Sequence, residues 1–428
     1  MMKFLRFVFV SVFLTLSYSL IASELENLLK GLDGVVSVEE LPTTEFFSEK
    51  YLIIFEQKVD KDDDDSEVFY QRVFLNHKSF TAPVIFTTEG YSADYAMNKN
   101  YINELCSILN GNEICVEHRY FSKSKPENID WHYLTTRNAA EDHHIIRKTL
   151  GQLYKVKWVS TGISKGGQTC LLYQMYYPND VDACVAYVAP IAKALEDGRH
   201  EPFINNVATK KERKKVSDFQ LEILKRRETI FPMFEQFCKA SKLSFQLPLE
   251  EIYDYCVLEY SFAFWQWVGN TERIPSKKED DSKLFQHWVA VAGPDYFSIE
   301  SSENVLPFYY QAARELGYYG YETTLFRKYL KIKTAKNYFK KVFLTKDMTP
   351  EFYSQTSIDL EKFVQTKAKN TILVYGEYDP WTAVAPEIVN TADLVKVVKP
   401  KGTHSTRIKN LPKVQHDMII NLLNSFME

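Results

Sequence analysis

Short apolar runs recur along the first part of the chain and end in glycine or charged residues, as strands do. The runs at 51–59 and 69–77 flank the acidic segment 60–65, which predicts a hairpin with a solvated tip. Further strands are predicted at 82–90, 113–121, 154–164 and 181–190, with helical segments between them. Strands that alternate with helices predict a mostly parallel sheet with helices on both faces.

The pattern changes at about residue 191 and becomes mainly helical and aromatic up to about residue 337. Strand signals resume at 371–379 and 393–400, and the segment 414–428 repeats apolar residues at helical spacing. The sequence therefore predicts an α/β core built from 23–190 and 338–428, interrupted by an inserted helical cap domain over 191–337.

The N-terminus has the layout of a signal peptide. Lys3 and Arg6 precede an apolar run that ends at Ala22, and acidic residues follow. A membrane anchor needs about 20 apolar residues, and this run is shorter. We expect a signal peptide over residues 1–22, a secreted or periplasmic mature protein, and no stable membrane insertion.

Charge and cysteine content narrow the function classes further. Lys and Arg total 52 against 56 Asp and Glu, so nothing in the charge balance points to nucleic acid. Six cysteines in an exported chain allow up to three disulfides, and Cys238 with Cys256 is the first pair expected. Cys170 and Cys184 are expected to be buried free thiols. No CxxC pair or HExxH helix is present, so neither a metal nor another cofactor is expected.

The strongest chemical signal is the segment Gly-Ile-Ser-Lys-Gly-Gly at 162–167, between an apolar strand and a helical run. That context is the one a nucleophile elbow requires, because small residues on either side of the serine let strand and helix approach closely. Ser164 is therefore the predicted nucleophile. The oxyanion hole would use the backbone N–H of Lys165 and that of Tyr91, with Gly90 allowing the close approach.

A serine nucleophile needs an imidazole base and a carboxylate that orients the base, and in this fold they follow in the order Ser, acid, His. His404 stands in a loop just past the strand at 393–400, and Asp379 lies just beyond the strand that begins at 371. Glu377 is an alternative acid. His416 falls within the predicted C-terminal helix, where a surface or cap position is expected.

These residues belong to motifs that resemble a known family along nearly the whole mature chain, in order. The motifs are TTEGY, VEHRYF followed by WHYLTTRNAAED, TGISKGGQT, EYSFAFWQW, YGEYDPW and GTHSTR. They look like the bacterial secreted prolyl tri- and tetrapeptidyl aminopeptidases (serine peptidase family thirty-seven) and, more distantly, like lysosomal Pro-X carboxypeptidase and dipeptidyl peptidase II. The resemblance implies an α/β-hydrolase core, the triad Ser164, Asp379 and His404, a capped site, and proline next to the cut bond. Ser122-Lys123 and GTHSTR depart from the carboxypeptidase relatives, which leaves the exopeptidase type open.

An aminopeptidase must also hold the free ammonium of its substrate, and carboxylates are suited to that task. Glu89 and Glu315 are candidates, whereas Glu117 is expected to brace the neighbouring Arg119. If a C-terminal carboxylate were recognised instead, Arg119 or Arg137 would be its partner.

Aromatic residues make up 14% of the chain, and some of them are expected to line a binding surface. Trp265, with Phe262, Phe264 and Trp267, would form a proline pocket or else pack the cap onto the core. A secreted serine exopeptidase acting on peptides is the leading interpretation. A prolyl carboxypeptidase, an esterase or lipase of the same fold, and a non-enzymatic binding protein on a hydrolase scaffold are the alternatives.

Overall fold

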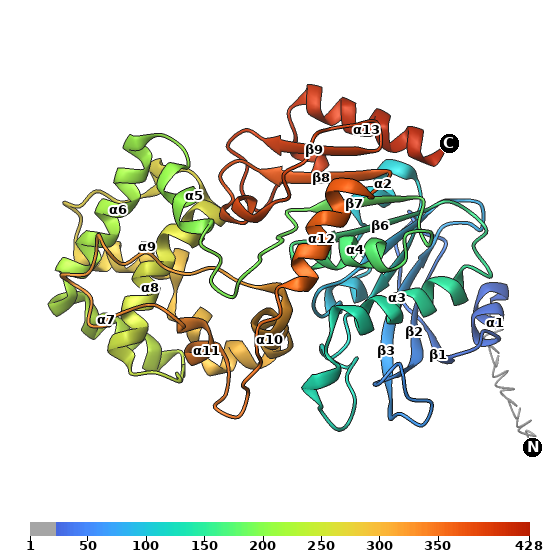
Figure 1. Cartoon of the computed structure of the whole chain (residues 1–428), viewed down its shortest axis with the longest axis horizontal. Helices are drawn as coiled ribbons and strands as arrows, with labels where there is room; N and C mark the ends of the chain where they lie inside the picture. The colour runs from blue at the N-terminus through green and yellow to red at the C-terminus, as the bar shows by residue number, and fades with distance from the viewer. Residues whose placement is uncertain (1–22) are drawn as a thin grey trace, which may run out of the picture.

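The computed structural model describes residues 23–428 and contains two lobes, a sheet-based core and a helical cap (Figure 1). The predicted signal peptide lies outside the described residues. Within residues 23–428, no helix has both the length and the apolar character needed to cross a membrane.

The core is one nine-stranded sheet in the order β1-β2-β3-β5-β4-β6-β7-β8-β9. The first three strands and β5 pair antiparallel, and every pair from β5 to β9 is parallel. The strands are β1 (Val35–Glu40), β2 (Glu49–Lys58), β3 (Val68–His77), β4 (Val84–Thr88), β5 (Asn112–Val116), β6 (Trp158–Ile163), β7 (Ala183–Tyr187), β8 (Thr371–Gly376) and β9 (Leu394–Lys399). The mostly parallel sheet is thus confirmed, and the acidic segment 60–65 forms the tip of the β2–β3 hairpin.

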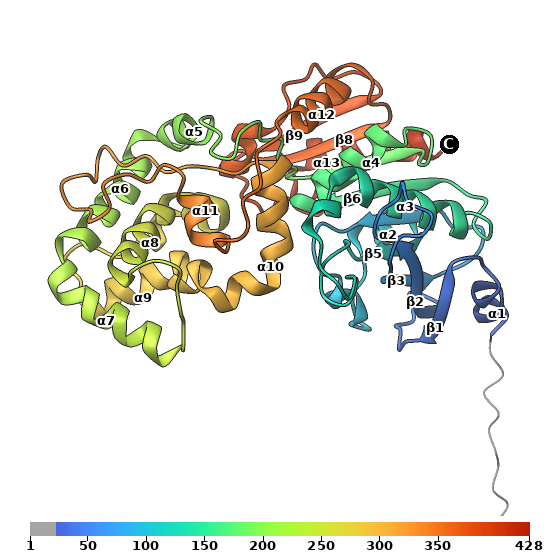
Figure 2. The same ribbon diagram turned by 60° about the horizontal axis from the view of Figure 1, so that its bottom comes forward.

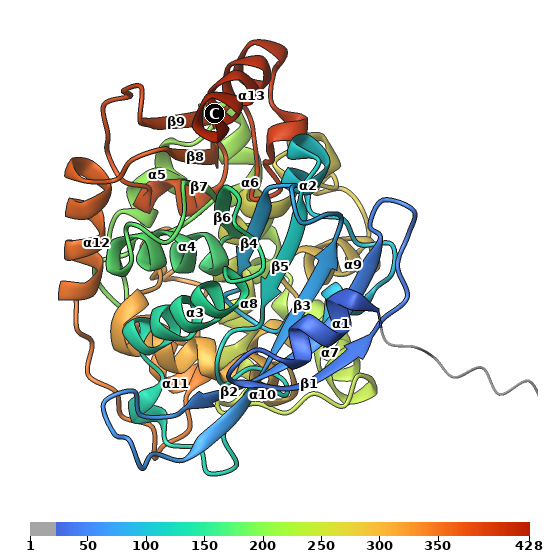
Figure 3. The same ribbon diagram turned by 90° about the vertical axis from the view of Figure 1, so that its right-hand side faces the viewer.

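Helices cover both faces of this sheet, which confirms the α/β-hydrolase architecture. Apolar residues of α2 and α13 share one cluster with the strands, while α1, α3, α4 and α12 pack on clusters of the other face. Figure 3 shows α3 beside α4, across the sheet from α13. These helices are α1 (Glu24–Lys30), α2 (Glu104–Leu109), α3 (Thr136–Leu150), α4 (Lys165–Tyr176), α12 (Gln355–Thr366) and α13 (Lys413–Met427).

The cap is a helical lobe with its own aromatic core (Figure 2). Its helices are α5 (His200–Asn206), α6 (Lys210–Lys225), α7 (Arg227–Ala240), α8 (Leu249–Ala263), α9 (Asp281–Ala292), α10 (Ile299–Gln311) and α11 (Tyr338–Phe343). Two π-helical turns, Phe264–Val268 and Ala312–Leu316, extend α8 and α10. Residues of α11 belong to the cap core, so the helical insertion continues past the boundary predicted at residue 337.

The predicted disulfide between Cys238 and Cys256 is wrong for this structure, because both residues are free and buried in the aromatic core of the cap. A buried thiol in such surroundings behaves as a small hydrophobic side chain. Cys170 and Cys184 are free and buried as expected, with their Sγ atoms 2.8 Å apart.

Candidate active site

Ser164 occupies a sharp turn between β6 and α4. Its backbone has φ 56° and ψ −121°, a conformation that a residue with a Cβ adopts only when the surrounding structure enforces it. Glycine is required two residues earlier, since a Cβ on Gly162 would lie 2.1 Å from the backbone oxygen of Gly166. The close approach of β6 and α4 at Gly162 therefore holds Ser164 in this turn at the end of the sheet.

The imidazole of His404 forms a hydrogen bond from Nδ1 to Oδ2 of Asp379 at 2.6 Å. Asp379 follows β8, is fully buried, and accepts a second bond from the backbone N–H of Trp381. The backbone N–H of His404 donates to the carbonyl of Gln266 in the cap at 2.9 Å, so the cap also fixes the histidine loop. His404 and Ser164 line the same cavity.

The two alternative residues lie elsewhere. Glu377 is exposed and accepts a hydrogen bond from the backbone N–H of Lys401. His416 lies on the half-buried side of α13, next to Asp417. The structure brings Asp379 rather than Glu377 to His404.

The loop after β4 packs directly against the first turn of α4. A Cβ on Gly90 would lie 2.6 Å from the backbone nitrogen of Gly166, so only glycine permits this approach. Within residues 23–428, the backbone N–H groups of Tyr91 and Lys165 donate to no protein acceptor. Two free donors thus flank Ser164, which is the arrangement that an oxyanion hole requires.

The side chain of Lys165 holds that loop in place. Its Nζ donates to the carbonyl oxygen of Gly90 at 2.5 Å and lies within 6 Å of the ring centres of Tyr91 and Phe121. Burial lowers the pKa of Lys165 well below its ordinary value, an effect that nearby Glu315 and Glu89 oppose.

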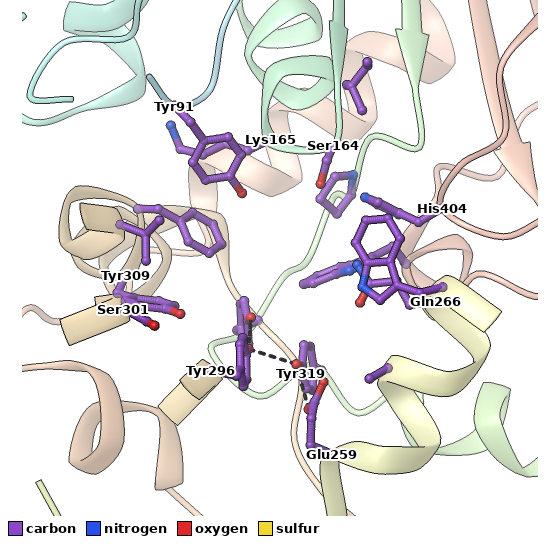
Figure 4. A pocket seen from close by; sticks show the side chains of 18 of the residues that line it. Tyr91, Ser164, Lys165, Glu259, Gln266, Tyr296, Ser301, Tyr309, Tyr319 and His404 are labelled. Atoms are coloured by element: carbon purple, nitrogen blue, oxygen red, sulfur yellow. Dashed lines mark hydrogen bonds between the residues drawn. The ribbon is translucent and has the colours of Figure 1, made fainter. Parts of the chain in front are cut away.

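The site opens into a cavity of about 850 Å³ between core and cap (Figure 4). Ser164, Lys165 and His404 stand on the core side, and aromatic side chains of the cap form much of the remaining wall. The core contributes Tyr91, Tyr95, Tyr101 and Trp381 to the aromatic part of the wall. The cap contributes Trp267, Tyr296, Phe308, Tyr309, Tyr318 and Tyr319. Part of the large aromatic content therefore lines the cavity.

Of the predicted recognition residues, Glu89 lines this cavity. Its carboxylate accepts a hydrogen bond from the hydroxyl of Tyr95, and burial raises its pKa. Gly90, the next residue, forms the close contact with α4 described above.

Glu315 and Trp265 do not line this cavity, which corrects the sequence-based expectation for both. The Glu315 carboxylate accepts bonds from the backbone N–H of Thr136 at 2.7 Å and from its hydroxyl at 3.1 Å, so it binds the first turn of α3. Trp265 is 1% exposed and packs edge-on against Tyr378. Trp267, two residues later, lines the cavity and lies edge-on to His404, with ring centres 5.1 Å apart.

The other charged candidates are structural. Glu117 accepts two hydrogen bonds from the guanidinium of Arg72, not from Arg119, so it braces β3 against β5. Arg119 is fully buried and pairs with Asp142 at 2.6 Å. Arg137 is exposed and does not line the cavity.

Sequence reasoning missed Glu259 in α8. Its side chain is 5% exposed, yet it lines the cavity and accepts hydrogen bonds from Tyr319 and Tyr321. The one available signal was its position at the start of the EYSFAFWQW motif.

The chain is similar to several known proteins. The sequence model of a family described as PS-10 peptidase S37 matches residues 21–417. A prolyl tri/tetrapeptidyl aminopeptidase of Streptomyces mobaraensis is 28% identical over 405 residues, covering 91% of this chain and 82% of that protein. A prolyl carboxy peptidase like protein 5 of Caenorhabditis elegans is 27% identical over 139 residues, which cover 29% of this chain and 27% of that one. A solved proline iminopeptidase of Mycobacterium smegmatis is 11% identical, with TM-score 0.43 over 91% of this chain and 98% of that chain.

Proposed function

Since this chain belongs to the PS-10 peptidase S37 family and is therefore a serine-type peptidase, we propose that it releases short N-terminal peptides by cutting after proline. The observation that carries the proposal is that His404, hydrogen-bonded to the buried Asp379, and Ser164 line one cavity between core and cap. The name of the Streptomyces relative supports the proline preference and the tri- or tetrapeptide length.

The proposed reaction is acyl transfer. The Oγ of Ser164 attacks the carbonyl carbon of the peptide bond while Nε2 of His404 takes the hydroxyl proton, and Asp379 stabilises the imidazolium that forms. The oxyanion accepts hydrogen bonds from the backbone N–H groups of Lys165 and Tyr91. His404 then gives the proton to the departing amine, and water, deprotonated by His404, hydrolyses the ester on Ser164.

Aromatic side chains near the reacting groups suit a pyrrolidine ring. Trp267 is 56% exposed, lines the cavity and lies against His404, so a proline side chain next to the cut bond can pack on its indole. We therefore assign the proline contact to Trp267 instead of Trp265.

We also propose that the protein is exported to the periplasm or outside the cell and that its partners are peptides. The basic and apolar pattern over residues 1–22 supports export. A carboxypeptidase or an esterase could use the same groups, because fold and triad do not fix the substrate.

Mass spectrometry of products separates these activities. Peptides with proline at the third or fourth position are incubated with the wild type and with Ser164→Ala, each peptide carrying a free or an acetylated N-terminus. We expect the wild type to release an N-terminal tri- or tetrapeptide only from free peptides. Ser164→Ala should slow the reaction by roughly 10⁴- to 10⁶-fold.

Other products would contradict the proposal. Loss of a C-terminal residue would identify a carboxypeptidase. Hydrolysis of simple esters without cleavage of any peptide would identify an esterase. Circular dichroism of Ser164→Ala, expected to match the wild type, serves as the control for folding.

A further inference from the structure

Glu259 is a buried carboxylate that faces the cavity without a cationic partner. Its Oε2 accepts hydrogen bonds from the hydroxyls of Tyr319 at 2.9 Å and Tyr321 at 2.7 Å. It forms no ion pair with any residue in 23–428. Burial raises its pKa to about 8.

Glu113 in β5 is also fully buried without an ion pair, but it accepts hydrogen bonds from Asn76 and Thr87 and does not line the cavity. Two further fully buried carboxylates have charged partners. Glu117 pairs with Arg72, and Asp142 pairs with Arg119 and with Lys61. Burying an unpaired carboxylate costs several kcal/mol. Because Glu259 lies on the wall of the cavity, a positively charged group of a ligand can reach it and supply the missing partner.

We propose that Glu259 binds the α-ammonium of the peptide substrate and thereby sets how many residues lie between the N-terminus and the cut bond. This inference rests on the proposed function and identifies the subsite that would make the protein an aminopeptidase. The ligand is a primary ammonium at a chain end, because a side chain that is only 5% exposed admits a terminal group and not a passing backbone.

Figure 4 shows Glu259 on the wall opposite Ser164, with Tyr296 and Tyr319 beside it on the side toward Ser164. An extended peptide advances by about 3.3 Å per residue, so an anchor across the cavity matches a substrate of several residues before the cut bond. Glu89 and Asp295 also line the cavity, but Asp295 is exposed and needs no ligand to offset burial. Glu89 adjoins Gly90 in the loop against the nucleophile helix. An ammonium held there would leave room for a shorter peptide.

The tyrosines position the anchor. Tyr319 and Tyr321 donate to the same carboxylate oxygen, and the hydroxyl of Tyr296 lies 3.0 Å from that of Tyr319. The second carboxylate oxygen has no partner among the residues described. It is free to accept the N–H bonds of an ammonium group, which are stronger than neutral hydrogen bonds.

The test compares Glu259→Gln with the wild type on two substrates, the aminocoumarin amide of Ala-Ala-Pro with a free N-terminus and p-nitrophenyl acetate. The ester is too small to reach Glu259 and reports on the triad alone. Glutamine keeps the size and one acceptor oxygen but removes the charge. We expect kcat/KM on the tripeptide to fall by roughly 100-fold, chiefly through KM, and ester hydrolysis to change less than about threefold.

Glu315→Gln is the matched control, because it neutralises another buried cap carboxylate that does not line the cavity. It should leave the ratio of tripeptide to ester activity unchanged. If Glu259→Gln also leaves that ratio unchanged while the wild type prefers free over acetylated tripeptide, the anchor lies elsewhere and this inference fails alone. If the wild type cuts free and acetylated tripeptides equally well, the proposed aminopeptidase function fails and the inference falls with it.

Discussion

At the scale of single residues, the proposed mechanism depends on the hydrogen bond between Asp379 and the imidazole of His404. Asp379→Asn keeps an oxygen that can accept from the backbone N–H of Trp381, but it presents His404 with an uncharged partner. We expect kcat to fall about 10⁴-fold while the fold is retained. In other serine peptidases the same substitution has this effect because it leaves the histidine in the wrong tautomer. Steady-state kinetics with circular dichroism checks this.

Glu377→Gln supplies the comparison for that experiment. It neutralises a carboxylate two residues before Asp379 that accepts a hydrogen bond from the backbone N–H of Lys401. Its kcat should stay within about threefold of the wild type. A loss under tenfold in Asp379→Asn, or an equal loss in both variants, would mean that Asp379 does not orient the base.

The pKa of Glu259 also predicts a pH dependence. With its pKa raised to about 8, the carboxyl of the free enzyme is mostly protonated at pH 6, and binding an ammonium then requires loss of that proton. The ratio of kcat/KM on free to acetylated Ala-Ala-Pro amide should therefore rise between pH 6 and 8. Above pH 8 it should fall, because the substrate's own amine, with a pKa of about 7.7–8.0, loses its charge.

The ratio cancels any pH effect that acts equally on both substrates. The groups facing Glu259 stay neutral over this range, since burial raises the pKa of every one of them: Cys256, Tyr296, Tyr309, Tyr318, Tyr319, Tyr321 and Tyr338. A ratio that is flat from pH 6 to 8 in the wild type, or that keeps its rise in Glu259→Gln, would contradict this assignment.

At the scale of elements, the contact between the loop after β4 and α4 fixes the two backbone donors of the proposed oxyanion hole. In Gly90→Ala the new methyl would lie 2.6 Å from the backbone nitrogen of Gly166 and 2.7 Å from the carbonyl carbon of Lys165, and backbone atoms cannot yield cheaply. The loop must then move away, so we expect kcat to fall by roughly 10²- to 10³-fold with a smaller change in KM.

Gly198→Ala is the matched substitution, because a Cβ at Gly198 meets nothing within 4 Å. It should leave kcat unchanged. Wild-type kcat in Gly90→Ala would show that the loop contact does not set the positions of the donors.

The elements that the sequence predicted well are those with strong local signals. The strand ends that carry Ser164 and Asp379 follow continuous apolar runs, and glycines mark the turns. Strand β1 gave no such signal, because this edge strand is only half-buried or exposed along its length. It was therefore missed.

The directions of side chains in the cap could not be predicted. Trp265 and Trp267 lie two residues apart on one π-helical turn. Trp265 is buried in the aromatic core of the cap, whereas Trp267 lines the cavity. Glu315 lies on the other π-helical turn and meets α3 instead of the substrate. Periodicity assumes a regular helix, so it cannot place residues where the helix is wider.

At the scale of the whole molecule, the site exists only because the two lobes meet. His404 of the core is held through its backbone by Gln266 of the cap, and Glu259 of the cap faces Ser164 of the core across the cavity. Neither relation has a local signal in the sequence, because each joins segments far apart in the chain. The residues of the proposed triad could be named from motifs, whereas the proposed anchor opposite them required the structure.

The central claim is that Ser164 attacks the carbonyl group of proline. The most direct measurement is peptide mapping by mass spectrometry after reaction with a diphenyl phosphonate analogue of Ala-Ala-Pro, which phosphonylates an activated serine. We predict one adduct per chain, located on Ser164 and absent from Ser164→Ala. An adduct on another residue, or proline-peptide cleavage that persists unchanged in Ser164→Ala, would contradict the account.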